Sequence, residues 1–153
     1  MVQLRVIVPL ASAAAMMFAC GPWSVTSQPE EAARHTRAVS DAPMASALDV
    51  RVADGVELAL TVTNNTKRTV ELEFADGLTH DFIVLDDKDK EVWRWSGGRM
   101  FTSAMQTKLM KSGKSATYHT HWHPEVLRGK YVAVAVLHAT NYPVSERVPF
   151  TLP

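Results

Sequence analysis

Apolar side chains alternate with polar or small ones in the stretch Val56-Glu57-Leu58-Ala59-Leu60-Thr61-Val62-Thr63. Successive side chains of a β-strand point to opposite sides, so this pattern predicts a strand with one buried face. The period of two continues outward along the chain in both directions. Strands are expected at residues 48–52, 56–63, 70–74, 81–85, 91–96, 106–110, 115–122, 131–138 and 144–152.

Short turn signals separate these strands, among them Asp54-Gly55, Asp76-Gly77 and Arg128-Gly129. No helical period of a dozen residues is found after residue 45. Many short strands joined by tight turns are typical of an antiparallel β-sandwich or barrel. The fold class is therefore all-β, and residues 46–153 are close to the roughly 100 residues of an immunoglobulin-like sandwich. Trp93, Trp95 and Trp122 are its expected bulky core residues.

The composition excludes several classes of protein. Lys plus Arg equals Asp plus Glu at 16 each in 153 residues. Without a basic surplus, a nucleic-acid binder is not expected. A single cysteine leaves no intramolecular disulfide and no cysteine-based zinc cage. The chain also lacks the Gly-x-Ser-x-Gly, His-Glu-x-x-His and phosphate-loop motifs, so no catalytic residues are assigned and a non-enzymatic role is expected.

The amino terminus has the pattern of an export signal. Arg5 is the only charged residue among the first 29 and precedes an apolar stretch that ends at Ala19. Residues 1–19 therefore read as a signal peptide of the lipoprotein type, too short and too interrupted by Pro9 for a comfortable membrane span. The alternative is a buried or membrane-spanning helix, which the polar segment that follows gives little to pack on.

Cys20 is the expected lipid anchor. Met17-Phe18-Ala19-Cys20 resembles the lipobox of bacterial lipoproteins, in which the cysteine is lipidated and becomes the first mature residue. Phe18 is bulkier than the family prefers, so cleavage after Ala19 by an ordinary signal peptidase is the alternative. The expected location is the cell membrane or outer membrane, facing the periplasm or the exterior. Residues 20–45 are mostly polar or small and are expected to be a flexible tether.

Several segments together resemble the BsuPI-type intracellular proteinase inhibitor family. They are residues 60–65, 70–77, 81–84, 91–96, 100–102 and 129–133. The most specific part is Trp93-Arg94-Trp95-Ser96 followed by Met100-Phe101. The resemblance implies a small immunoglobulin-like β-sandwich that binds a protein partner, with a serine protease as the expected class. Asp81 belongs to the family pattern and is expected to be a structural hydrogen-bonding residue.

Arg99, Met100 and Phe101 form the candidate partner-binding loop. They follow Gly97-Gly98, and a basic residue followed by apolar ones suits an extended segment in a protease cleft. The alternative is a plain crossover with Met100 and Phe101 against the core. For the preceding strand, tryptophans in the core and Arg94 in solvent, paired with Glu73 or Glu91, are favoured over an aromatic platform for a partner or glycan.

His119, His121 and His123 are the candidate metal ligands. Side chains at i and i+2 of a strand share a face about 7 Å apart, so two of these imidazoles could hold zinc or nickel. The alternative is a row of exposed polar residues, and no cofactor is the favoured reading. The remaining functional alternative to inhibition is an envelope lipoprotein with an adhesion or accessory role.

Overall fold

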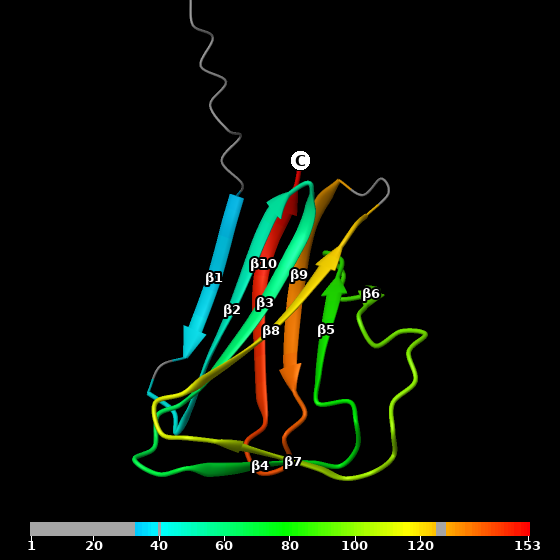
Figure 1. The fold of residues 1–153 in the computed structure, drawn as a ribbon. Helices are drawn as coiled ribbons and strands as arrows, with labels where there is room; N and C mark the ends of the chain where they lie inside the picture. Colours follow the sequence, from blue (N-terminus) through cyan, green and yellow to red (C-terminus); the bar gives the residue numbers. More distant parts are fainter. Residues whose placement is uncertain (1–32, 40, 125–127) are drawn as a thin grey trace, which may run out of the picture.

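The computed structural model describes residues 33–39, 41–124 and 128–153 (Figure 1). Within these ranges the chain is all-β, as the alternation predicted, and all its strand pairings are antiparallel. The strands are β1 (Ala33–Val39), β2 (Met44–Ala53), β3 (Gly55–Asn64), β4 (Val70–Phe74), β5 (His80–Leu85), β6 (Glu91–Arg94), β7 (Gln106–Met110), β8 (Ser115–Trp122), β9 (Gly129–Leu137) and β10 (Val144–Leu152).

Two four-stranded sheets face each other (Figure 1). The first has the order β1-β2-β3-β8, and the second has the order β10-β9-β5-β6. A two-stranded sheet of β4 and β7 lies at one end. Across the described residues, no helix is long and apolar enough to cross a membrane.

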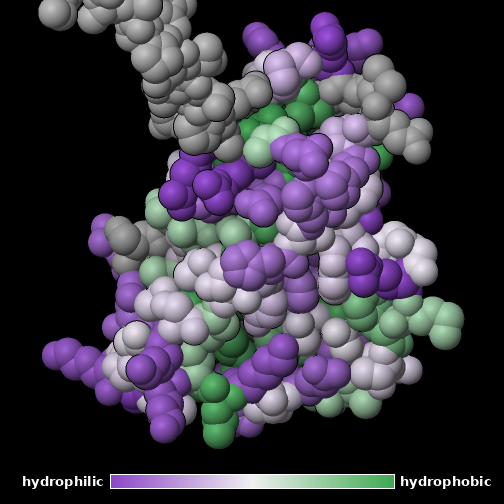
Figure 2. Space-filling model, turned by 45° about the horizontal axis from the view of Figure 1, so that its top comes forward, coloured by the Kyte–Doolittle hydropathy of each residue, from purple (hydrophilic) through white to green (hydrophobic). Residues whose placement is uncertain are grey.

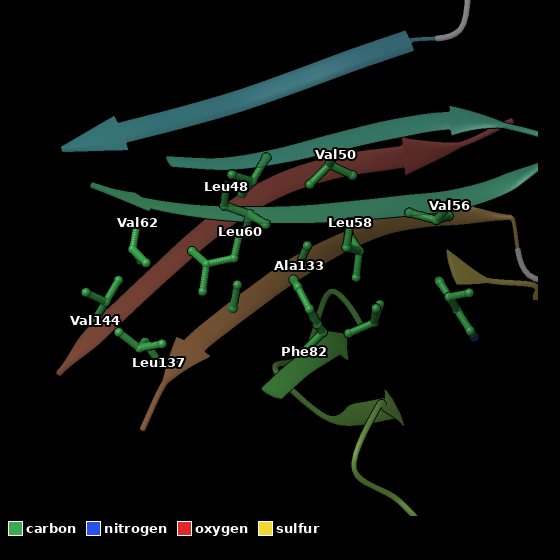
Figure 3. Packing of buried hydrophobic residues seen from close by; sticks show 14 of the residues in the cluster. Leu48, Val50, Val56, Leu58, Leu60, Val62, Phe82, Ala133, Leu137 and Val144 are labelled. Carbon is green, nitrogen blue, oxygen red and sulfur yellow. The ribbon is translucent and has the colours of Figure 1, made fainter. Parts of the chain in front are cut away.

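The core fills the space between the sheets. Leu58, Leu60 and Val62 of β3 are almost fully buried and point toward β5 and β9, where Phe82 and Leu137 lie (Figure 3). The intervening residues of β3 are less buried, so the period of two in the sequence becomes an inner and an outer face. Each buried side chain of this size contributes about 1.5–3 kcal/mol relative to an exposed one.

Residues 33–39 are a β-strand and not part of the flexible tether that the sequence predicted. They form β1, which pairs along its length with β2, from Ala33 opposite Val52 to Val39 opposite Ser46. The segment is too polar to show a clear alternation. It is held instead by backbone pairing and by side-chain contacts with Asp49. Residues 20–32 of the expected tether, the signal peptide at 1–19 and Cys20 lie outside the described residues.

Charged contacts fasten β1 to both sheets. Arg34 forms an ion pair with Asp49 of β2, and Thr36 Oγ1 donates a hydrogen bond of 2.9 Å to Asp49 Oδ1. These donors lower the pKa of Asp49, with the Arg34 hydrogen bond the largest cause. On β10, Arg37 Nε lies 3.6 Å from Glu146 Oε2. β1, the edge strand of the first sheet, is therefore tied to β10, the edge strand of the second sheet, on one side of the sandwich.

Candidate functional site: a braced loop with an exposed methionine

Residues 95–105 connect β6 to β7 and are hereafter the Met100 loop. Its first part is a double turn, in which Gly97 N donates to Arg94 O at 3.1 Å and Arg99 N donates to Ser96 O at 3.1 Å. Gly98 has φ 72°, the left-handed region that glycine adopts most easily. After this turn, Met100 has 97% of its surface exposed.

The two neighbours of Met100 are held against Trp95. Arg99 Nε donates to Trp95 O at 2.8 Å, and the guanidinium lies 4.6 Å from the centroid of the Trp95 ring. The Phe101 ring lies 5.8 Å from the same indole. Phe101 is therefore against the protein, as the crossover alternative expected, whereas Met100 is not. The loop presents Met100 between two anchored residues.

The far side of the loop is fastened by Gly77. Gly77 N donates to Thr102 O at 2.8 Å. A Cβ at position 77 would lie 2.8 Å from Thr102 Cγ2, closer than real Cβ contacts, and a tight 3.1 Å from Thr102 N. Glycine at this position thus permits the close approach that fixes the loop where it leaves Phe101.

Trp95 is the outer member of an aromatic stack that also contains His80 and Tyr118. The His80 ring of β5 lies 4.5 Å from Trp95 and 4.3 Å from Tyr118 of β8. The stack therefore joins the two sheets and ends at the Met100 loop. Burial lowers the pKa of His80 to about 4, with a smaller contribution from the charge of Lys108. Burial also raises the pKa of Tyr118. His80 is thus a neutral spacer at pH 7, rather than an exposed acid or base.

The expected core tryptophans divide into two kinds. Trp122 is buried, whereas Trp93 and Trp95 are partly buried and pack against the core. Trp93 lies 6.1 Å from Trp122, between ring centroids, with an interplanar angle of 29°. This contact joins β6, an edge strand of the second sheet, to β8, an edge strand of the first sheet. Aromatic packing thus spans this side of the sandwich.

Asp81 is the structural hydrogen-bonding residue that the family pattern implied. It is 1% exposed, and its Oδ2 accepts hydrogen bonds from Arg94 Nη1 at 2.9 Å and Ser96 Oγ at 2.6 Å. Its Oδ1 accepts from the backbone N of Phe82 at 2.9 Å and of Ser96 at 3.0 Å. The carboxylate therefore fixes the start of the Met100 loop to β5.

Arg94 joins this network to the solvent-facing side. Its Nη2 lies 2.6 Å from Glu91 Oε2, so the expected pairing with Glu91 is confirmed. Its second partner is Asp81, whereas Glu73 lies on β4. Arg94 lowers the pKa of Glu91, and Glu91 is in turn the largest cause of the raised pKa of Arg94.

Other apolar side chains are also exposed near this loop in the sequence. Figure 2 shows apolar groups projecting from the right-hand edge and lower end of a mostly polar face. Among the described residues, the large apolar side chains that are exposed are Val92 at 39%, Met100 at 97%, Met105 at 80% and Leu109 at 74%. Met105 and Leu109 had not been singled out in the sequence.

The candidate metal ligands are only partly brought together. His121 and His123 stack with their centroids 4.2 Å apart, and His121 Nε2 lies 3.1 Å from Asp54 O. In the described part of the chain, no group of three or more His, Cys, Asp or Glu side chains is placed to hold a metal ion. Metal binding by His119, His121 or His123 stays a prediction.

A groove on the outer face of the first sheet includes two of these histidines. It is lined by Arg34, Asp49, Arg51, Glu57, Leu58, Ala59, His119, Thr120 and His121. Its charged groups include the Arg34–Asp49 pair and an Arg51–Glu57 pair with 3.7 Å between Nη1 and Oε2. The four charges of this groove are therefore paired with one another. The Met100 loop, by contrast, projects an apolar side chain.

Comparison with known proteins covers most of the sandwich. A family model described as BsuPI, intracellular proteinase inhibitor, matches residues 44–142, which is more than half of the 153 residues. The match begins at the first residue of β2 and includes the Met100 loop, while β1 and β10 lie outside it. No curated protein matches the chain.

Proposed function

Since the chain belongs to the BsuPI intracellular proteinase inhibitor family, we propose that it inhibits a protease by binding it through the Met100 loop. The single observation that carries the choice of loop is the 97% exposure of Met100 between two neighbours held on Trp95. The role is one of binding, and no catalytic residue is assigned to this chain.

The shape of the loop suits a protease cleft. Proteases recognise a side chain by placing it in a specificity pocket, and some of these pockets are apolar slots. Met100 is unbranched and apolar, so it fits such a slot. Its transfer from water into the pocket would contribute about 1.5–3 kcal/mol. The proposed partner is therefore a serine protease with an apolar specificity pocket.

The bracing of the loop favours binding over flexible attachment. Ordering a free loop on binding opposes affinity, and a loop already held in place avoids much of that cost. Arg99 and Phe101 each contact Trp95 at the start of the loop, and Thr102 O accepts a hydrogen bond from Gly77 N outside it. The same contacts would hold the two sides of residue 100 together if the protease cut the chain there, which favours resealing over release.

The proposed location follows from the leader. Residues 1–19 have the charge and apolar pattern of an export signal, and Cys20 follows Ala19 as in a lipobox. We propose that Cys20 carries a lipid and holds the domain at the cell envelope. If Cys20→Ala leaves the protein equally membrane-associated in cells, the anchor proposal is wrong.

The inhibitor proposal is tested by titrating a panel of serine proteases with the purified protein. Proteases with apolar specificity pockets are expected to lose activity when the protein is added at a near-equimolar ratio to the protease. Met100→Ala should weaken inhibition about tenfold or more, because it removes most of the apolar side chain that would be buried in the protease pocket. Met105→Ala is the matched control, since it shortens an exposed methionine in the same loop, and it should inhibit like the wild type.

Two outcomes would contradict the proposal. If every protease of the panel stays fully active, the inhibitor proposal is wrong and the adhesion or accessory role is favoured. A pull-down from envelope extracts is then the next experiment. Rapid cleavage after residue 100 with release of active protease would make the protein a substrate. Met100→Lys adds a positive check, because it should move inhibition toward proteases with an acidic pocket.

A further inference from the structure

The methionines of the described residues fall into two sharply different groups. Met44 and Met110 are buried, with 6% and 7% of their surface exposed. Met100 and Met105 are 97% and 80% exposed. An oxidant in solution therefore reaches the sulfur atoms of the Met100 loop well before those of the core.

From this placement we propose that Met100 is an oxidation site, and that its conversion to the sulfoxide switches off binding of the protease. The inference rests on the proposed function for its readout. The oxidant of Met100 is a peroxide, such as hydrogen peroxide. The Met100 sulfur lone pair attacks one peroxide oxygen, the O–O bond breaks, and water leaves. The sulfur loses two electrons and the peroxide is reduced.

The sulfoxide changes the part of the loop that the proposed binding mode uses. Oxidation turns a flexible apolar side chain into a polar, chiral one. Placing the S=O group in an apolar pocket without a hydrogen-bond donor opposes binding. Arg99 and Phe101 are both held on Trp95, so neither is free to take the place of residue 100. A single oxygen atom thus changes affinity at the tip of an otherwise unaltered loop.

The fold is protected from the same reaction. Met110 and Met44 are within the buried cluster, where peroxide has little access. The Met100 side chain is almost entirely in solvent, so its oxidation removes little native packing. The switch therefore acts on binding and leaves the folded state in place. It is reversible, because a sulfoxide reductase with a dithiol returns the sulfur to the thioether and releases water, while the dithiol becomes a disulfide.

The test compares Met100→Leu and Met105→Leu with the parent protein, all in a Cys20→Ala background that removes the only thiol. Each protein is treated with dilute hydrogen peroxide, its oxidised residues are mapped by mass spectrometry, and inhibition is titrated before and after treatment. Leucine keeps an apolar side chain of similar size without sulfur. A thermal unfolding curve of each treated sample reports whether the fold has changed.

We expect Met100 and Met105 to be oxidised before Met44 and Met110. Compared with its own untreated sample, the parent and Met105→Leu should each lose inhibition about tenfold or more on oxidation, whereas the inhibition by Met100→Leu should be the same before and after treatment, whatever its starting value. Reduction of the sulfoxide should restore the parent.

Inhibition that survives complete oxidation of Met100, or that is lost equally in Met100→Leu, overturns the switch alone. If no untreated protein inhibits any protease, the proposed function has failed, and the switch fails with it.

Discussion

Arg94 Nη1 lies 2.9 Å from Asp81 Oδ2, so an arginine that is 38% exposed neutralises a carboxylate that is only 1% exposed. The two residues are thirteen positions apart and lie on β6 and at the start of β5. Their contact connects the interior of the second sheet to the beginning of the Met100 loop.

Asp81→Ala should lower the free energy of unfolding by about 2–4 kcal/mol, because Arg94 and Ser96 lose their shared acceptor. Glu91→Ala is the control, since it removes the exposed partner of Arg94 and should cost at most about 1 kcal/mol. Urea unfolding followed by tryptophan fluorescence measures both. Equal losses of unfolding free energy in the two variants would show that the buried contacts of Asp81 stabilise the fold no more than the exposed contact of Glu91.

Arg99→Ala should weaken protease inhibition about two- to tenfold while the unfolding midpoint stays nearly constant. The substitution removes the hydrogen bond to Trp95 O and the contact with the indole ring, so the loop must be ordered on binding. Lys111→Ala, which removes an exposed cation in the β7–β8 turn, controls for charge. A fall in inhibition of the same size in the control would point to general electrostatic attraction instead.

His80 should make stability depend on pH between 6.5 and 4. Its pKa is about 4 in the folded protein and 6.5 as the ordinary value, so within this window the unfolded chain binds the extra proton. The free energy of unfolding therefore falls as the pH falls through the window. His80→Phe keeps an aromatic ring between Trp95 and Tyr118 and should flatten this part of the stability curve.

Chemical unfolding at several pH values between 7 and 4 provides the comparison for His80. His119→Gln, a substitution on the exposed face of β8, controls for the loss of a histidine as such. Parallel curves for the wild type and His80→Phe would show that His80 does not couple protonation to unfolding.

Arg37→Ala should destabilise the protein by about 1–3 kcal/mol, because Glu146 is only 4% exposed and loses its cation. Ser46 Oγ still donates to Glu146 Oε1 at 2.6 Å, which limits the loss. Arg51→Ala breaks the exposed pair with Glu57 and should cost at most about 1 kcal/mol. Adding Glu146→Gln to Arg37→Ala should recover part of the stability, and a double-mutant cycle by urea unfolding checks it.

Most strands of the sandwich could be predicted from the sequence, because a strand that is buried on one face has apolar residues at every second position. The expected strand at 70–74 coincides with β4, and the one at 144–152 coincides with β10. β1 was missed because its apolar residues are few and it is held by pairing with β2 and by ion pairs, which leave no local pattern.

The candidate site could be predicted only in its local part. Gly97-Gly98 before Arg99 and Met100 indicated a turn into an exposed segment, and Met100 is exposed. The stack of Trp95, His80 and Tyr118 joins three separate segments, and the Asp81–Arg94 pair links the neighbouring strands β5 and β6. Such contacts depend on tertiary arrangement and have no fixed spacing along the chain.

The position of β1 has a consequence for steric clearance. β1 is the outer strand of the first sheet next to β2, whereas the Met100 loop packs through His80 onto Tyr118 of β8, at the opposite border of that sheet (Figure 1). A body as large as a protease would approach the flank remote from Ala33. β1 itself therefore leaves this approach path clear, and its position does not restrict the size of a partner that binds at the Met100 loop.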